Sequence, residues 1–136
     1  MKSILLPTLR FRRTWVGFGL LLAGIITFYS LIPAQRLPSM GVSDKVEHIA
    51  AYVLLAFFFG SLITRRDYKF LFLALLAFGG GIEIAQGLMK LGREADLLDL
   101  VADLVGAVIG LLLAVTPLGR WPALIERWVA HKARHP

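Results

Sequence analysis

The sequence contains no cysteine among its 136 residues. This absence excludes a disulfide framework, a thiol nucleophile and a thiolate metal site. Charged residues are also scarce, at 18% of the chain, whereas 57% of the residues are hydrophobic and the mean hydropathy is +0.72. A soluble domain of this length has more surface than so few polar groups can cover. The composition therefore predicts a single membrane-embedded domain, residues 1–136.

Several familiar motifs are missing as well. The chain has no G-x-S-x-G nucleophile motif, no internal repeat and no low-complexity linker. The run "GGG" at 79–81 lies inside an apolar segment and does not follow a strand, so we interpret it as a helix-packing surface and not as a phosphate loop. The sequence thus offers no standard hydrolase or nucleotide-binding signature.

Four apolar segments are long enough to cross a bilayer. We expect transmembrane helices at about 15–32, 46–63, 70–89 and 97–115. Each has 18–20 residues, which at about 1.5 Å per residue gives roughly 27–30 Å, close to the hydrocarbon thickness. The first segment follows a basic "RFRR", as a signal peptide does, but no clean cleavage site follows it, and we expect it to be retained. The fold class predicted is an all-α four-helix membrane bundle.

Basic residues are distributed unequally between the alternate connections. Of the 15 Lys and Arg residues, 11 lie on the side that holds both termini and the loop 64–69, and four lie on the other side. Because cytoplasmic loops carry the basic excess, we expect both termini in the cytoplasm. Topogenesis and anionic headgroups also explain the isoelectric point of about 10.2, so no nucleic-acid partner is expected.

The C-terminal segment "GRWPALIERWVAHKARHP" has an amphipathic pattern. Its apolar residues recur at helical spacing: Trp121, Leu124, Ile125, Trp128 and Val129. Basic residues surround them. This pattern predicts an interfacial helix at about 121–133 that lies in the inner headgroup layer.

Polar side chains gather at the outer ends of three predicted spans. They form three triplets with the spacing i, i+3, i+7: Lys45, His48 and Tyr52; Glu83, Gln86 and Lys90; Asp96, Asp99 and Asp103. Each triplet occupies one stripe of its helix. Lipid does not solvate such groups, so the stripes should face one another inside the bundle. "GAVIG" at 106–110 continues the acidic stripe and predicts close packing on the same face. The pattern predicts a polar pocket that opens outward.

Three motifs resemble the signature of the VanZ-like family of small bacterial integral membrane proteins. They are "DKVEHIAAYVLL" (44–55), "EIAQ" (83–86) and "READLLDLVADLVGAVIG" (93–110), and the resemblance covers about residues 15–115. It implies a multi-pass protein of the bacterial cytoplasmic membrane and a link to resistance against the glycopeptide teicoplanin. Some relatives carry a label as butyryl phosphate acyltransferases, which this membrane-embedded site does not support. Asp103 stands where the family commonly has Asn, which adds a charge. The motif residues carried over are Asp44, Lys45, His48, Tyr52, Glu83, Gln86, Arg93, Asp96, Asp99 and Gly106.

The first hypothesis for the pocket is a binding site for a lipid headgroup or another cell-envelope ligand. Lys45, Lys90 and Arg93 would hold a phosphate or carboxylate, and the acids would accept hydrogen bonds from hydroxyls or amines. The ligand would be a phospholipid headgroup, a lipid-linked wall precursor or the antibiotic itself. The predicted ligand-binding residues are Asp44, Lys45, His48, Tyr52, Glu83, Gln86, Arg93, Asp96, Asp99 and Asp103.

Three other uses of the pocket remain open. In an acid–base enzyme His48 would act with Glu83 or Asp99, and these three are the catalytic candidates, with Tyr52 as an acid. In a purely structural network the polar groups would lock helices together, at roughly 0.6 kcal/mol per interhelical hydrogen bond. A proton relay or transporter is the third use. No cofactor is expected. No metal is expected either, because the spacing of His48, Glu83, Asp99 and Asp103 is not a known ligand motif. A homodimer through a second small-residue face is left open.

Overall fold

The computed structural model describes residues 5–6, 8–33, 43–89 and 96–133. Within these residues it contains five α-helices: α1 (Arg12–Leu31), α2 (Asp44–Gly60), α3 (Tyr68–Met89), α4 (Leu97–Val115) and α5 (Trp121–Lys132). The described part of the chain has no β-strand, and an isolated antiparallel bridge joins Leu5 to Ile63. The predicted all-α class is therefore confirmed.

The helix limits differ most from the prediction at α2. This helix begins at Asp44, because Asp44 and Glu47 in its first turn favour the positive end of the helix dipole. It ends at Gly60, where the chain turns so that the Leu62 carbonyl accepts a hydrogen bond from the Leu6 amide. The predicted limits of 46–63 were therefore displaced toward the C-terminus.

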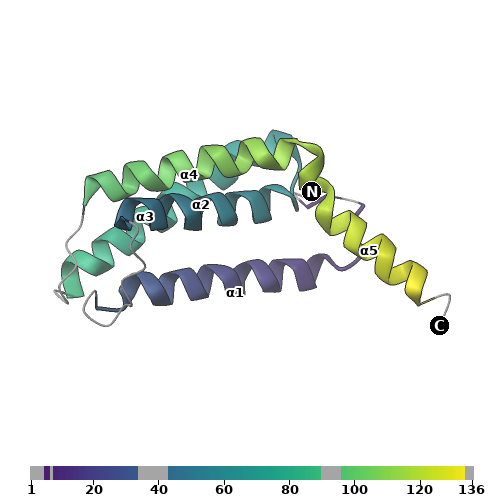
Figure 1. Cartoon of the computed structure of the whole chain (residues 1–136), viewed down its shortest axis with the longest axis horizontal. Helices are drawn as coiled ribbons and strands as arrows, with labels where there is room; N and C mark the ends of the chain where they lie inside the picture. Colours follow the sequence, from purple (N-terminus) through teal and green to yellow (C-terminus); the bar gives the residue numbers. More distant parts are fainter. Residues whose placement is uncertain (1–4, 7, 34–42, 90–95, 134–136) are drawn as a thin grey trace.

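The first four helices lie alongside one another and alternate in direction (Figure 1). The beginnings of α2 and α4 and the ends of α1 and α3 thus meet at one end of the bundle, and α5 turns away at the opposite end. Among the described residues, three helical segments are long and apolar enough to cross a membrane: Arg12–Leu31, Arg65–Met89 and Leu97–Val115. The segment Arg65–Met89 includes a short 3₁₀ turn before α3. The length and composition of these segments fit a membrane protein.

The packing of α4 against α2 fixes the centre of the bundle. A Cβ atom added to Gly106 would lie 2.5 Å from the backbone oxygen of Ile49, and one added to Gly110 would meet the backbone oxygen of Val53. Only glycine allows the two backbones to approach so closely. Asp99 and Asp103 are buried on the same face of α4. The prediction that this face is internal is confirmed.

By contrast, α1 buries little of its surface. Gly19 is its buried residue, and the rings of Phe58 and Phe59 lie against it. Large apolar side chains of α1 are exposed: Phe18, Leu20, Leu21, Ile25, Phe28 and Tyr29. An apolar exposed surface of this kind is suited to contact with lipid acyl chains.

The attachment of α5 to α1 was not anticipated from the sequence. The carboxylate of Glu126 accepts hydrogen bonds from the backbone amides of Arg10 and Phe11, at 2.7 and 2.9 Å, and from the Trp15 indole at 2.9 Å. The Trp15 ring also packs edge-on against Trp121, with 5.1 Å between the ring centroids. Glu126 thereby satisfies the amides of the two residues immediately before α1, including that of its N-cap residue Phe11.

The apolar side chains of α5 are otherwise exposed. Four of them are between 42% and 64% exposed: Leu124, Ile125, Trp128 and Val129. Trp121 is the member of this face that packs against the bundle, on Trp15 and Phe58. The amphipathic helix is thus confirmed over Trp121–Lys132, and its exposed apolar face is available to a membrane surface.

We expect the docking of α5 to weaken in acid. Burial raises the pKa of Glu126, but the hydrogen bonds from Arg10, Phe11 and Trp15 outweigh it and hold this pKa below its ordinary value. A depressed carboxyl pKa gives stability that is present above the ordinary pKa of about 4.3 and is lost as the pH falls through the folded-state value. Glu126→Gln should therefore cost about 1 kcal/mol at neutral pH and flatten the acid dependence.

Tryptophan fluorescence and thermal unfolding in detergent, followed from pH 7 to pH 3, measure this effect. Asp67→Asn, at the same end of the bundle, is the control and should keep the wild-type acid profile of the tryptophan signal. A Glu126→Gln protein with the wild-type profile would show that the Glu126 carboxylate does not hold α5.

Candidate functional site

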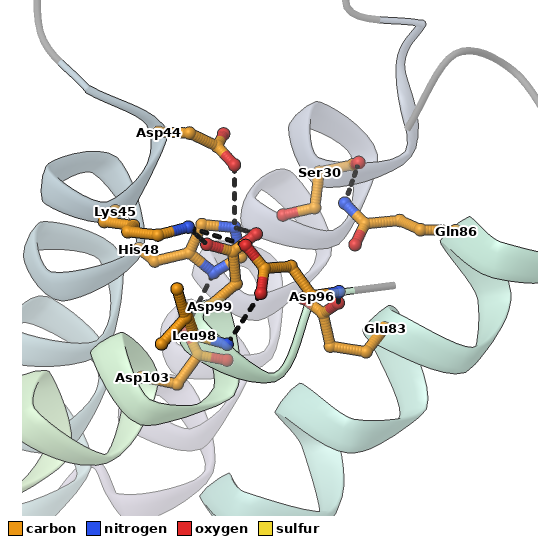
Figure 2. Close-up of polar contacts among 10 residues, drawn as sticks. All are labelled: Ser30, Asp44, Lys45, His48, Glu83, Gln86, Asp96, Leu98, Asp99 and Asp103. Atoms are coloured by element: carbon orange, nitrogen blue, oxygen red, sulfur yellow. Dashed lines mark hydrogen bonds and ion pairs between the residues drawn. The ribbon is translucent and has the colours of Figure 1, made fainter. Parts of the chain in front are cut away.

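Seven ionisable side chains lie together at the end of the bundle where α2 and α4 begin and α3 ends. We call them the polar cluster: Asp44, Lys45, His48, Glu83, Asp96, Asp99 and Asp103 (Figure 2). His48, Glu83, Asp99 and Asp103 are buried. The cluster therefore joins three helices, as the predicted stripes required, and its roles in binding or catalysis remain predictions.

The Lys45 ammonium forms ion pairs with two aspartates at the beginning of α4. Its Nζ atom lies 2.8 Å from Asp96 Oδ2 and 2.8 Å from Asp99 Oδ1. The hydrogen bond from the Lys45 ammonium, together with that from the Leu98 backbone amide, holds the pKa of Asp96 below its ordinary value. Since two carboxylates already share this ammonium, Lys45 is poorly suited to hold a phosphate or carboxylate ligand.

Asp96 also organises the beginning of α4. It is the N-cap residue, and its Oδ1 accepts a hydrogen bond from the Leu98 amide at 2.8 Å. Its own backbone amide donates to Glu83 Oε2 at 2.8 Å, so α3 is tied to α4 at this point. Capping by aspartate satisfies an amide that the first helical turn leaves unpaired. The cluster is therefore built partly on ordinary helix-capping chemistry.

His48 has two different environments at its two ring nitrogens. Nδ1 lies 2.8 Å from Asp103 Oδ1, whereas Nε2 lies 3.9 Å from Asp99 Oδ2 and 4.0 Å from Asp44 Oδ2. A carboxylate accepts hydrogen bonds, so Asp103 assigns the proton of the neutral ring to Nδ1 and leaves Nε2 with its lone pair. The side chains of His48 and Asp103 are only 9% and 3% exposed. The imidazole is therefore fixed, with Nε2 directed at two carboxylates.

The partner of His48 differs from the one that the sequence suggested. We expected Glu83 or Asp99 to act with the imidazole, but the hydrogen-bonded acid is Asp103, and Asp99 lies beyond hydrogen-bond distance. Glu83 binds the Asp96 amide instead. The catalytic set of His48, Glu83 and Asp99 thus lies in one cluster without forming a hydrogen-bonded relay among the described contacts.

A glycine on α3 makes room for the deepest part of the cluster. A Cβ atom added to Gly79 would lie 2.5 Å from Asp103 Oδ2 and 2.8 Å from the Tyr52 hydroxyl oxygen. Tyr52 itself is 2% exposed. The other two glycines of the "GGG" run have nothing within 4 Å of such an atom, so the packing function predicted for this run belongs to Gly79.

Three predicted site residues are not among the seven side chains of the polar cluster, and one of them, Tyr52, borders its deepest part at Gly79. The Gln86 side chain donates from Nε2 to the backbone oxygen of Ser30, at 2.8 Å, and so links α3 to the end of α1 (Figure 2). Arg93 lies outside the residues that the structure describes, as does Lys90. The prediction of an arginine fork at this site is therefore not tested.

Carboxylates outnumber cationic side chains within the described cluster. Asp44, Glu83, Asp96, Asp99 and Asp103 face one lysine and one histidine. The Oε1 atom of Glu83 is also buried and has no hydrogen-bond partner among the described residues. An arrangement of this kind attracts cations more strongly than anions.

Comparisons with known proteins gave one family. The sequence model of the VanZ/LLP1 family matches residues 4–119, which include all four helices of the bundle and the entire polar cluster. No curated protein and no solved structure matched the chain. The motifs in α2, α3 and α4 and the match over most of the chain agree, and the chain belongs to the VanZ/LLP1 family.

Proposed function

We propose that the chain is a single-domain, four-span protein of the bacterial cytoplasmic membrane with both termini inside. The helix α2 has 17 residues and reaches about 25 Å, the short limit for a span. It lies between helices that are long enough to cross. The end of the bundle opposite the polar cluster carries the basic side chains Arg10, Arg65, Arg66, Lys69, Arg120, Arg127 and Lys132. The positive-inside rule then directs the cluster outward.

The polar cluster in this proposal binds the primary amine of a lipid headgroup or another envelope molecule. The observation that carries it is the excess of carboxylates over cations at one end of three helices. Glu83 Oε1 supplies a buried acceptor without a hydrogen-bond partner among the described residues, while Oε2 accepts from the Asp96 amide, and an unsatisfied carboxylate oxygen is costly in a low-dielectric environment. An ammonium group from the outer leaflet would neutralise it.

A purely structural network explains the same residues less well. Helices are locked together by neutral polar groups at little cost, whereas charged side chains in a bilayer are expensive and are usually functional. Here Lys45 balances only part of the negative charge of Asp96 and Asp99. Helix capping and the hydrogen bonds of Glu83 and Asp103 do not neutralise the remaining negative charge, which favours a bound cation.

Lipid retention tests the proposal. The purified protein in mixed micelles should retain phosphatidylethanolamine at least tenfold better than phosphatidylcholine, whose quaternary amine cannot donate hydrogen bonds. Native mass spectrometry measures the bound lipid. Glu83→Gln and Asp96→Asn should abolish the preference, since each removes one carboxylate from the cluster.

Glu47→Gln is the matched control, because Glu47 lies in the first turn of α2 and its side chain makes no hydrogen bond or ion pair with the described cluster. It should keep the preference. Equal retention of both lipids by the wild-type protein, together with equal retention of a lipid-linked wall precursor and its N-acetylated form, would refute the amine site.

The teicoplanin link implied by the family resemblance gives a cellular measurement of the same proposal. Expression in a sensitive bacterium should raise tolerance to teicoplanin, and Glu83→Gln should remove that tolerance without changing the amount of protein in the membrane. If a strain that expresses Glu83→Gln at the wild-type level were still resistant to teicoplanin, resistance would not depend on the polar cluster.

A further inference from the structure

Three ligand-type atoms lie close together at the beginning of α2 and α4. They are Asp44 Oδ2, His48 Nε2 and Asp99 Oδ2, and all lie within 4.8 Å of one another. Nε2 of His48 lies 4.0 and 3.9 Å from the two carboxylate oxygens. It makes no hydrogen bond among the described residues, although the ring is 91% buried, since its exposed fraction is 9%. We propose that these three residues bind a divalent transition-metal ion of the Zn²⁺ or Mn²⁺ class.

The distances suit an ion after a small contraction. Ligand atoms at about 2.0–2.2 Å from an ion lie roughly 3.0–3.6 Å apart, depending on the geometry. The two separations from His48 Nε2 exceed this range by a few tenths of an ångström, and the two carboxylate oxygens lie within 4.8 Å of each other. Asp44 is the member that can move, because its side chain is 47% exposed and it begins α2. Asp44 and His48 are one helical turn apart, which places both on the same face.

Two of the three proposed ligands, His48 and Asp99, form a hydrogen bond through the polar atom that does not face the ion. His48 Nδ1 binds Asp103 Oδ1 at 2.8 Å, and Asp99 Oδ1 binds Lys45 Nζ at 2.8 Å. Metal ligands usually have hydrogen-bonding partners of this kind. One partner is a carboxylate that fixes the tautomer of a ligating histidine, and another orients a ligating carboxylate. In this proposal Asp103 and Lys45 are positioning residues, and Asp44, His48 and Asp99 are ligands.

The ligand set selects among ions. One imidazole nitrogen with two carboxylates suits Zn²⁺ or Mn²⁺, whereas Mg²⁺ and Ca²⁺ prefer oxygen ligands alone. Three protein ligands leave at least one coordination position open. The inference goes beyond the amine proposal and does not need it, because the ion uses Asp44, His48 and Asp99 and the amine is assigned to Glu83.

Equilibrium dialysis with the metal alone tests this site. The purified full-length protein, treated with a chelator and dialysed against Zn²⁺ or Mn²⁺, should bind one equivalent as measured by elemental analysis. Asp44→Asn and His48→Gln should each lower the affinity at least 100-fold. Asp103→Asn should lower it 10–100-fold while the protein stays folded, since an amide oxygen can still accept from Nδ1.

His131→Gln is the matched control, because it removes a histidine from α5 at the other end of the bundle. It should leave the stoichiometry and affinity unchanged. Less than one equivalent bound by the wild-type protein, or Asp44→Asn binding with wild-type affinity, would overturn the metal site. Neither outcome would alter the lipid preference assigned to Glu83, so the two proposals fail separately.

Discussion

Replacing Gly106 with leucine is expected to separate α4 from α2 and to destabilise the protein by about 3 kcal/mol, the upper part of the usual range for overpacking. The added Cβ would lie 2.5 Å from the Ile49 backbone oxygen and 3.1 Å from its Cα. These are backbone atoms, so no change of side-chain rotamer removes the clash and one helix has to shift. Because Lys45 and His48 on α2 bind aspartates on α4, the same shift should also disrupt the polar cluster.

Gly81→Leu is the matched control for this substitution. An added Cβ at Gly81 would have nothing within 4 Å, and leucine is a better helix former than glycine by somewhat less than 1 kcal/mol. Thermal unfolding in detergent should therefore show a large loss of stability for Gly106→Leu and none for Gly81→Leu. Equal effects of the two substitutions would show that the close approach of α2 and α4 does not set the packing.

The helices could be predicted because their signals are local. All five helices were predicted from apolar segments of about 20 residues, from prolines at 33 and 117 and from the amphipathic spacing of 121–129. The predicted limits of α4 are those observed. The limits of α2 were less accurate, because acids in its first turn were counted as polar flanks and not as helix. Three helical segments are long and apolar enough to cross a membrane, and α2 is not one of them. This helix therefore lies close to the length limit for a span.

The pairing of particular acids and bases required the register between α2 and α4. These two helices run in the same direction (Figure 1), so residues at matching depth meet: Lys45 with Asp99, and His48 with Asp103. The contact of Gly106 with Ile49 sets this register. The stripes predicted which faces meet, but not the shift along the helix axes, so the sequence alone did not identify Asp103 as the acid that forms a hydrogen bond with His48.

The partners of two side chains that form long-range hydrogen bonds could not be identified from the sequence. Glu126 binds amides 115 and 116 residues away, and Gln86 binds a carbonyl 56 residues away. The amphipathic pattern placed Glu126 in the interfacial helix without a partner, and Gln86 was predicted as a ligand-binding residue of the polar pocket. A glutamate inside an amphipathic basic helix is the sort of exception that could have suggested a specific partner.

The outward position of the polar cluster is the claim on which the proposed function depends, and the absence of native cysteine makes it directly measurable. Ser43→Cys places a thiol immediately before α2, beside the cluster, and Ser43 makes no side-chain capping hydrogen bond that the change would remove. Arg66→Cys places one at the opposite end of the bundle, in the exposed 3₁₀ turn before α3. The two positions therefore report on the two membrane surfaces.

The decisive measurement is labelling of these two variants with a membrane-impermeant maleimide in right-side-out spheroplasts, before and after permeabilisation. We predict that Ser43→Cys reacts in intact spheroplasts and that Arg66→Cys reacts only after permeabilisation. Labelling of Arg66→Cys from outside, with Ser43→Cys protected until the membrane is opened, would place the polar cluster at the cytoplasmic surface and contradict the account.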